Sequence, residues 1–178
     1  MDPALFTQLE VQQWLVAEAR LLDARRYDLW LQLLDPGVRY RVPDRSYRLQ
    51  DDVRDFATWS VDRELEGEAG LALIDEDHAG LQLRIGRLRT TMGWAEMPAS
   101  MSRRLVGNVV VDGAEDAEDC LSVVSTLFLA KVRREERVLF TAERRDRLVQ
   151  TKDGYRLRAR YVVLDDVVLP SENLSLLF

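Results

Sequence analysis

The residues of this sequence that could carry out acid-base chemistry are one aspartate and a few tyrosines. Asp23 ends the first apolar helical pattern, and Tyr27, Tyr40 or Tyr161 could lie beside it after folding. One buried carboxylate with a tyrosine is enough for proton transfer, because burial raises the pKa of a carboxyl group toward neutrality. The candidate acid-base pair is Asp23 with Tyr27. A helix that ends at Asp23 and tyrosines that line a core explain the same residues, so both interpretations stay open.

Metal chemistry is limited by the number of possible ligands. The 178-residue sequence has a single histidine, His78, and a single cysteine, Cys120. A Rieske cluster needs two of each, and a mononuclear iron site of the facial-triad kind needs two histidines and a carboxylate. The chain alone can build neither of these sites, nor a zinc site of the usual Cys/His kind. We expect His78 to be a helix cap or a surface residue, and Cys120 to be a small buried hydrophobic residue.

Motifs and charge exclude several other classes of function. The sequence has no phosphate-binding loop of the form GxGxxG or GxxxxGK[ST] and no GxSxG nucleophile motif. The formal net charge of −6 argues against a nucleic-acid partner, because phosphate-binding surfaces are normally basic. The start Met1-Asp2-Pro3 lacks a signal-peptide pattern, and no apolar run approaches the ~18 residues of a membrane span. We therefore expect a soluble cytoplasmic protein with no membrane partner.

The elements that must position these residues are dominated by a long hairpin near the C-terminus. Two alternating segments, residues 137–150 and 155–163, flank Lys152-Asp153-Gly154, which is a strong local turn signal. Side chains alternate across a strand. In the first segment Val138, Phe140 and Ala142 therefore share one face, with Thr141, Glu143 and Arg145 on the other. This pattern predicts a long, half-buried antiparallel pair that needs a large surface to pack against.

Arginines are concentrated on this hairpin and alternate with acidic residues. In the second segment Tyr155, Leu157, Ala159, Tyr161 and Val163 share one face, and Arg156, Arg158 and Arg160 point the opposite way. The first segment adds Arg144, Arg145 and Arg147 beside Glu143 and Asp146. Cross-strand ion pairs on a solvated face explain this pattern. A protein–protein interface explains it equally well, because guanidinium groups are favoured there.

The remaining periodicity predicts an α+β fold in one domain, residues 1–178, with a flexible N-terminus over 1–6 and a tail over 171–178. Thr7 and Glu10 have the spacing of a capping box, and Asp75 could cap a later helix. Residues 44–70 are expected to be mostly loop. The predicted helices cover residues 8–23, 27–34 and 78–90, and the predicted strands cover 38–42, 71–74, 103–111 and 120–133, before the hairpin. One strongly curved, mostly antiparallel sheet wrapped around the N-terminal helices would bury all these faces.

Six stretches match one family pattern in the same order along the chain. They are EARLLD at 18–23 followed by Tyr27 and Trp30, LRIGRLRT at 83–90, WAEMPAS at 94–100, Asn108-Val109, RRDRL at 144–148 followed by Asp165, and LPSENLSL at 169–176. Together they resemble the small (β) subunit of the bacterial aromatic-ring-hydroxylating dioxygenases, in the Rieske non-heme iron oxygenase family. Two departures are Arg103-Arg104-Leu105, where the family often has R-H-L, and the segment 44–70, which aligns with nothing in the pattern.

The resemblance implies a cone-shaped fold similar to nuclear transport factor and scytalone dehydratase, and a hexamer of three large (α) and three small subunits. In that family the large subunit carries the Rieske 2Fe-2S cluster and the mononuclear iron, and no cofactor is expected in this chain. The family adds both atoms of O2 to an arene to give a cis-dihydrodiol, with NAD(P)H-derived electrons that arrive through a reductase and often a ferredoxin. The stretch from Trp94 to Pro98 is similar to the hydrocarbon-oxidising branch.

The implied role of this chain is assembly, with no active site of its own. We expect the subunit interface to include residues of the matched stretches and arginines on the strands: Trp94, Glu96, Arg103, Arg104, Arg144, Arg145, Arg160, Asp165 and Asn173. Two alternatives stay open. One is a free-standing dehydratase or isomerase that uses Asp23 and Tyr27, and the other is a module that binds a small ligand without catalysis.

Overall fold

The structure is a computed structural model that describes residues 3–46, 60–67, 70–89, 100–112, 120–170 and 176–178. Its helices are α1 (Pro3–Asp23), α2 (Tyr27–Leu31) and α3 (His78–Arg89), with a short 3-10 helix, η2 (Val61–Glu64). Its strands are β1 (Leu34–Pro43), β2 (Ala72–Asp77), β3 (Met101–Asp112), β4 (Cys120–Arg133), β5 (Glu136–Thr151) and β6 (Gly154–Leu164). No helix in these ranges is long and apolar enough to cross a membrane.

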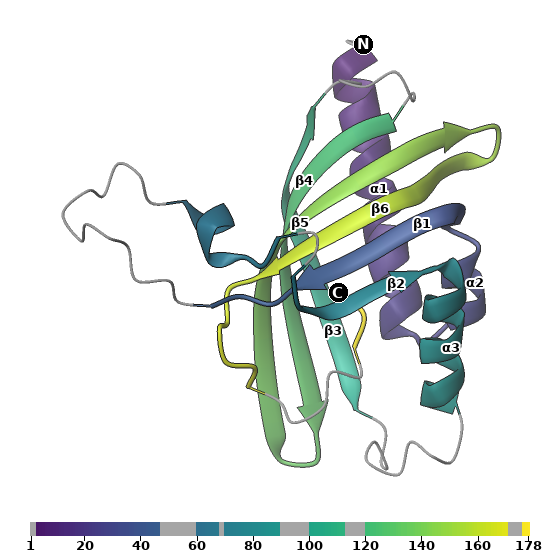
Figure 1. The fold of residues 1–178 in the computed structure, drawn as a ribbon. Helices are drawn as coiled ribbons and strands as arrows, with labels where there is room; N and C mark the ends of the chain where they lie inside the picture. Colours follow the sequence, from purple (N-terminus) through teal and green to yellow (C-terminus); the bar gives the residue numbers. More distant parts are fainter. Residues whose placement is uncertain (1–2, 47–59, 68–69, 90–99, 113–119, 171–175) are drawn as a thin grey trace.

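The six strands form one mixed sheet in the order β2-β1-β6-β5-β4-β3. Every neighbouring pair is antiparallel except β1 and β6, which run parallel. Helix α1 lies along one side of the sheet and contacts β3, and α2 and α3 lie near the β1–β2 end (Figure 1). We call the face that α1 covers the inner face. The α+β class and the mostly antiparallel sheet are confirmed.

The predicted hairpin is confirmed as β5 and β6, and β4 has the predicted bounds. Thr151 pairs with Gly154 across the turn. Gly154 has a φ of 112°, a conformation that other residues rarely adopt, which explains a glycine at this position. Phe140 and Ala142 are buried on the inner face, and Glu143 lies exposed on the other, as the alternation predicts.

A bulge in β6 makes one part of the prediction wrong. Arg147 pairs with Ala159 but Leu148 pairs with Leu157, so Arg158 is an extra residue on β6. An extra residue reverses which side chains point inward beyond it. Leu157 is buried before the bulge, and Arg160 is buried after it. Arg160 therefore does not share a solvated face with Arg156 and Arg158.

Helix α1 starts at Pro3 and not at the predicted Gln8, so Thr7 and Glu10 lie inside the helix and form no capping box. The helix also includes Pro3–Phe6, part of the segment expected to be flexible. Tertiary contacts explain the early start, because Gln8 donates to the Val109 carbonyl at 2.5 Å and accepts from the Val111 N–H at 3.1 Å. These bonds hold the first turns of α1 against β3.

Helix α2 and the start of α3 also differ from the prediction. The predicted helix over 27–34 ends at Leu31, because Leu34 already pairs with Leu157 as the first residue of β1. Asp75 lies inside β2 and caps nothing; the Asp77 carboxylate accepts a 2.8 Å hydrogen bond from the Gly80 N–H in the first turn of α3. β2 continues past the predicted end at Ile74 because Asp75, Glu76 and Asp77 pair with Arg41, Tyr40 and Arg39 of β1.

The core lies between α1 and the inner face of the sheet. Its largest apolar side chains are Trp30, Tyr40, Phe140 and Phe178. Cys120 is buried, as expected, and His78 is the half-buried first residue of α3. Within the predicted loop over 44–70, the described part contains η2 and a bridge between Arg45 and Leu65.

Candidate functional site

Four charged side chains meet between α1 and the inner face of the sheet, and we call them the interior cluster: Glu18, Arg144, Asp146 and Arg160. Glu18 comes from α1, Arg144 and Asp146 come from β5, and Arg160 comes from β6. Each of the four is at most 1% exposed. Arg144 and Asp146 point inward because they continue the alternation of Phe140 and Ala142 along β5. The bulge in β6 turns Arg160 toward them.

Arg160 bridges the two carboxylates of the interior cluster. Its Nε and Nη2 each donate a 2.8 Å hydrogen bond to an oxygen of Asp146, the residue directly opposite on β5. Its Nη1 and Nη2 donate to the two oxygens of Glu18 at 2.6 and 2.9 Å. The indole Nε1 of Trp30 donates a further hydrogen bond of 3.1 Å to Glu18. Two-oxygen contacts of this kind fix the geometry of a guanidinium group as well as its charge.

Arg144 lies beside this bridge at ion-pair distances only. Its Nη1 is 3.5 Å from Glu18 Oε2, and its Nη2 is 3.6 Å from Asp146 Oδ2. None of its three guanidinium nitrogens has a hydrogen-bond partner among the residues that the structure describes. Burial lowers the pKa of Arg144, and the neighbouring Arg160 lowers this pKa further. The interior cluster therefore contains buried hydrogen-bond donors for which the described part of the chain offers no acceptor.

The interior cluster is suited to ion pairing and not to proton transfer. Burial raises the pKa of Glu18, but Arg160 and Arg144 more than offset this effect, and the pKa of Glu18 lies below its ordinary value. Burial lowers the pKa of Arg160, yet Asp146 and Glu18 bring that pKa well above its ordinary value. A general acid or base works best when its pKa lies near the operating pH. Glu18 and Arg160 are held charged instead.

The last described residues, which we call the inner tail (Leu176–Phe178), lie buried against this cluster. Tyr40 Oη donates a 2.7 Å hydrogen bond to the main-chain oxygen of Phe178 and accepts a 2.6 Å bond from its N–H. Arg160 Nη1 donates to the same oxygen at 2.9 Å. Burial raises the pKa of Tyr40, so its hydroxyl keeps the proton that it donates.

The candidate acid-base pair lies where two helices meet, with Asp23 as the last residue of α1 and Tyr27 as the first residue of α2. The Asp23 carboxylate accepts hydrogen bonds from the Arg104 N–H at 2.9 Å, from the Ser102 hydroxyl at 3.3 Å and from the Arg104 guanidinium group. These bonds join the end of α1 to β3. Tyr27 is the half-buried first residue of α2 and packs against the core. The geometry supports the other interpretation, in which Asp23 holds elements together.

The predicted interface residues separate into buried and accessible groups. The side chains of Arg104, Arg144 and Arg160 are at most 2% exposed, so they do not lie on a solvated face of this chain. Arg104 instead donates from Nη2 to the Leu177 carbonyl at 2.5 Å. Arg103, Arg145 and Asp165 are accessible: Arg103 and Asp165 are exposed, and the side chain of Arg145 is 39% exposed. The predictions for Trp94, Glu96 and Asn173 lie outside the described residues.

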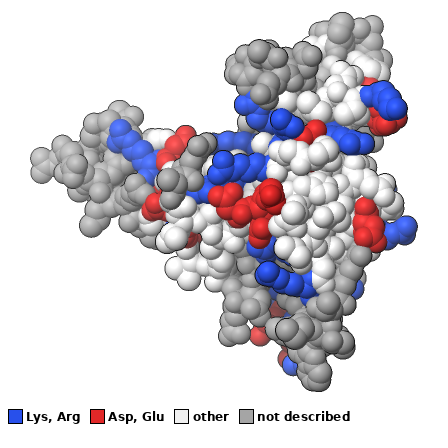
Figure 2. All heavy atoms as spheres, turned by 45° about the vertical axis from the view of Figure 1, so that its right-hand side comes forward, with Lys and Arg blue, Asp and Glu red and all other residues white. Residues whose placement is uncertain are grey.

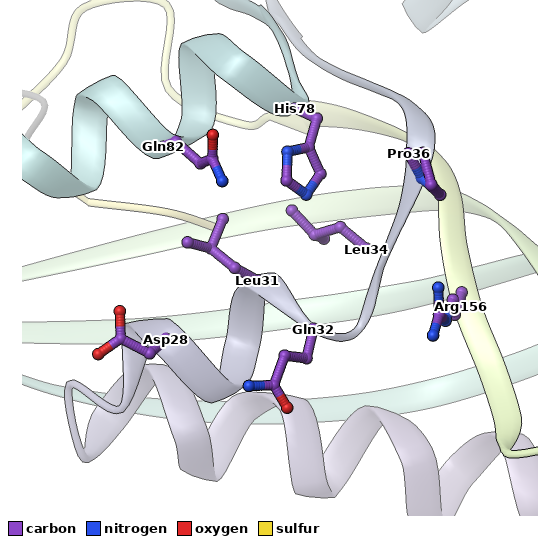
Figure 3. A pocket seen from close by; sticks show the side chains of 8 residues that line it. All are labelled: Asp28, Leu31, Gln32, Leu34, Pro36, His78, Gln82 and Arg156. Carbon is purple, nitrogen blue, oxygen red and sulfur yellow. The ribbon is translucent and has the colours of Figure 1, made fainter.

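A cavity of about 500 Å³ lies between α2, α3 and the first residues of β1 (Figure 3). Its lining is mixed in polarity: Asp28, Leu31, Gln32, Leu34, Pro36, His78, Gln82 and Arg156. His78 and Gln82 reach into the cavity from α3, above Leu31 and Leu34 (Figure 3). One histidine gives too few ligands for a zinc or iron centre here. No group of three or more His, Cys, Asp or Glu that could hold a metal occurs in the described ranges.

A second depression, of about 310 Å³, lies over β1, β4, β5 and β6 and is rich in arginine. Its lining is Arg39, Arg41, Ser122, Arg145, Asp146, Arg147, Ala159, Arg160 and Tyr161. Acidic partners offset much of this charge, because Arg41 pairs with Asp75 and Arg145 pairs with Asp62 at 2.8 Å. In the view of Figure 2, rows of Lys and Arg run beside groups of Asp and Glu, and a largely uncharged area lies next to them. This mixed surface differs from the single-sign field of a phosphate-binding face.

Sequence reasoning missed the roles of Glu18, Tyr40 and Phe178. Strict alternation from Phe140 and Ala142 could have placed Arg144 and Asp146 inside, and a buried pair of opposite charges then needs further partners. The bulge at Arg158 has no local sequence signal, so alternation along β6 could not predict that the Arg160 side chain points inward. Tyr40, Phe178 and Arg160 are distant in sequence and meet only in the folded chain.

The sequence is similar over most of its length to one protein family and to individual members of it. The family model described as "Ring hydroxylating beta subunit" matches residues 17–171. The β subunit of chlorobenzene dioxygenase from Cupriavidus sp. (strain PS12) is 34% identical over 176 residues, 96% of this chain and 88% of that protein. The β subunit of biphenyl 2,3-dioxygenase from Rhodococcus jostii (strain RHA1) is 33% identical over 183 residues, 100% of this chain and 91% of that protein.

A structural comparison agrees on the fold. A solved structure of naphthalene 1,2-dioxygenase with indole bound in the active site has a chain that matches with a TM-score of 0.81 and 24% identity. The match covers 96% of this chain and 85% of that one. The helix at the N-terminus and the six-stranded mixed sheet are therefore shared with a chain of that enzyme.

Proposed function

This chain belongs to the family of ring-hydroxylating dioxygenase β subunits, and we propose from this premise that it is the small assembly subunit of an oxygenase that converts an arene to a cis-dihydrodiol. The reaction adds both atoms of O2 and uses electrons from NAD(P)H. The single observation that carries the proposal is similarity over nearly the whole length of the chain to β subunits of such enzymes. The names of these relatives favour a chlorinated or unsubstituted aromatic hydrocarbon as the substrate class.

The geometry supports a subunit that contributes assembly and no active site. Arg160 and Arg144 hold the interior carboxylate of Glu18 as a charged ion-pair partner, and Arg104 and Ser102 occupy the carboxylate of Asp23. A catalytic carboxyl group needs access to a substrate proton in a cavity. These carboxyl groups instead connect α1 to β3, β5 and β6. A free-standing dehydratase or isomerase that uses Asp23 and Tyr27 would first have to release the Asp23 carboxylate from Ser102 and Arg104.

We propose that the redox metals lie on the large subunit. The residues of this chain do not fit a Rieske cluster or a mononuclear iron centre, because the full sequence has one histidine and one cysteine. Cys120 is buried in β4, and His78 starts α3. The proposed role is to hold large subunits together in a cytoplasmic hexamer of three large and three small subunits. Ferredoxin and reductase would then reach this chain only indirectly, through the large subunit.

The proposed interface uses accessible residues of the predicted set: Arg103, Arg145 and Asp165, with Trp94, Glu96 and Asn173 still as predictions. The side chains of Arg104, Arg144 and Arg160 are buried in this chain, so we assign them to the stability of the fold and not to direct contact with the large subunit. We also expect the sheet to curve strongly and give the cone shape of the nuclear transport factor fold. An experimental structure of the hexamer would measure that curvature and locate the contacts.

The test is to express the chain with and without the large-subunit gene that neighbours its own. We expect the pair to purify as one complex whose mass by light scattering equals three large and three small subunits, with iron and turnover of an arene. We expect the chain alone to bind no stoichiometric iron and to turn over nothing. Iron or turnover in the isolated chain, or failure of the two chains to associate, would contradict the proposal.

A further inference from the structure

One part of the sheet presents large apolar side chains to solvent. Strands β5, β4 and β3 are neighbours at one end of the sheet, and α1 lies on their inner face (Figure 1). On the opposite, outer face, Met101 is 55% exposed, Leu105 69%, Phe128 45% and Leu139 53%. We call these four residues the outer patch. Single exposed apolar residues are common, whereas a contiguous group of them usually marks a contact surface.

The strand register arranges the side chains around the outer patch in four rows. Each row takes one residue from β3, β4 and β5, in that order: Gly107–Thr126–Glu143, Leu105–Phe128–Thr141, Arg103–Ala130–Leu139 and Met101–Val132–Arg137. Directly paired residues on one face of a sheet are neighbours, so the rows form one surface. Its first row ends in the exposed Glu143 and its last row ends in the exposed Arg137. The two sides of the surface therefore carry opposite charges.

Opposite charges at the two sides fit a second copy of the same chain that is turned end over end. Two sheets that pack face to face in the aligned way keep their strand directions within about 30° of each other. A two-fold axis that crosses the strands at Leu129 lays each strand on its counterpart in the opposite direction. Leu129 pairs with Phe140, and Arg137 and Glu143 are equally far from Phe140 along β5. The rotation therefore places Arg137 of each copy over Glu143 of the other.

The same rotation also matches large side chains with small ones. Phe128 lies over Ala130 of the second copy, and Met101 lies over Gly107 of the second copy. Well-packed interfaces have this kind of shape complementarity. A two-fold axis along the strands would instead place Phe128 on Phe128 and Arg137 on Met101, which carries no charge. Charge and size together therefore select the axis that crosses the strands.

We propose that two copies of this chain pair through their outer patches, with the sheets face to face and the two-fold axis across the strands at Leu129. The apolar residues form the centre of the contact, and Arg137 and Glu143 form charged pairs at its two sides. A contact of this symmetry uses the same surface on both copies and closes at two. The proposed hexamer holds three small subunits, an odd number that cannot be divided into pairs. We therefore assign the pair to chains outside the hexamer.

The first test measures the mass of the full chain alone by light scattering. Concentrations from about 1 to 100 μM are suitable, because contacts of modest area can have micromolar dissociation constants. We expect the mass to rise from 20.6 kDa to twice that value. Leu139→Asp should weaken the pair about tenfold or more, because it buries an unpaired carboxylate at the centre. Leu71→Asp is the matched control: Leu71 is 76% exposed but precedes β2, at the other edge of the sheet, so the pair should persist.

Charge variants test the two-fold arrangement itself. Arg137→Glu and Glu143→Arg should each weaken the pair about tenfold, because each places like charges against each other at both sides of the contact. An equimolar mixture of these two variants should pair at least as tightly as the unchanged chain, since every charge then meets its opposite. Both residues are exposed, so we expect both variants to keep the fold.

Three results would overturn the proposal. The first is a chain that stays at 20.6 kDa over the whole concentration range. The second is a mixture of the charge variants that associates no better than either variant alone. The third is a Leu139→Asp chain that keeps its mass when free but no longer joins the large subunit, which would assign the outer patch to the large subunit. The mass measurements use the small chain alone, so their failure is distinguishable from a failure of the proposed assembly function.

Discussion

Replacement of Arg160 by methionine tests whether the interior cluster stabilises the fold. The substitution keeps much of the side-chain length but removes the charge that bridges Glu18 and Asp146. Arg144, at 3.5 and 3.6 Å, is then the one described cation that pairs with both carboxylates, and Glu18 keeps its hydrogen bond from Trp30. If the arginines of β5 and β6 formed ion pairs on a solvated face, this change would hardly lower the free energy of unfolding. If they form a buried cluster, the carboxylates of Glu18 and Asp146, each at most 1% exposed, lose their main partner away from bulk solvent.

The expected loss follows from the burial of this site. Breaking a buried ion pair by removing one partner costs about 3–5 kcal/mol, because a buried charge is left without compensation. The same substitution at Arg145, whose side chain is 39% exposed, should cost about 0–1 kcal/mol, the usual range for an exposed pair. Arg145 is a matched control, since it lies on the same hairpin and pairs with two acids, Glu143 and Asp62.

Urea unfolding, followed by circular dichroism, measures both losses. We expect Arg160→Met to lower the free energy of unfolding by about 3–5 kcal/mol at an unchanged slope, and to lower the melting temperature by roughly 6–20 °C. Arg145→Met should remain within about 1 kcal/mol of the unchanged chain. Equal losses for the two variants, or a loss below about 1 kcal/mol for Arg160→Met, would refute the reasoning about the interior cluster.

The pH dependence of the same measurement has a defined sign. In the unchanged chain the pKa of Glu18 is lowered in the folded state, so its stabilising contribution is present above its ordinary pKa and is lost as the pH falls through the folded value. In Arg160→Met the effect of burial should dominate and raise the folded pKa of Glu18. That variant should therefore gain stability as the pH falls from neutrality toward about 5. The difference between the two proteins should shrink on acidification, and a constant difference would contradict this account.

Three further predictions follow from the contacts around the site. Asp23→Asn should lower the free energy of unfolding by about 1–3 kcal/mol, because it weakens charged hydrogen bonds to Arg104. Turnover of the complex should stay within a few-fold of the unchanged complex. Complete loss of turnover in an intact hexamer would revive the acid-base interpretation. Tyr40→Phe should cost about 1–3 kcal/mol in urea unfolding, since two bonds to Phe178 are lost, and an unchanged midpoint would mean that they contribute nothing. Arg145→Glu should weaken binding to the large subunit in light scattering, and a hexamer of unchanged mass and affinity would remove Arg145 from the interface.

Periodicity predicted the strands of this fold well. The alternation along β4 and β5 and the turn signal at Asp153-Gly154 are local features, and local steric rules act on them directly. The ends of α1, α2 and β1 were less predictable, because tertiary contacts set them. Gln8 bonds to β3 hold the first turns of α1, and the pairing of Leu34 with Leu157 ends the helical segment early.

The candidate site was harder to predict than the fold. The pattern of charges on the hairpin indicated ion pairs between β5 and β6, and Asp146 does pair with Arg160 directly across the strands. The pattern could not show that this pair is buried. Burial depends on the bulge at Arg158, on Glu18 from α1 and on the inner tail, which all come from distant parts of the chain.

The amino-acid sequence by itself determined that this chain cannot build the redox centres of a Rieske oxygenase, because a count of one histidine and one cysteine holds in any fold. It also determined the long antiparallel hairpin, because a period of two is a property of neighbouring residues. Only the tertiary structure decided that Arg144 and Arg160 lie inside with Glu18, Asp146 and Phe178. The reason is physical: one extra residue in β6 reverses the inward face, and the partners that make burial of these charges possible meet only when the sheet and α1 come together.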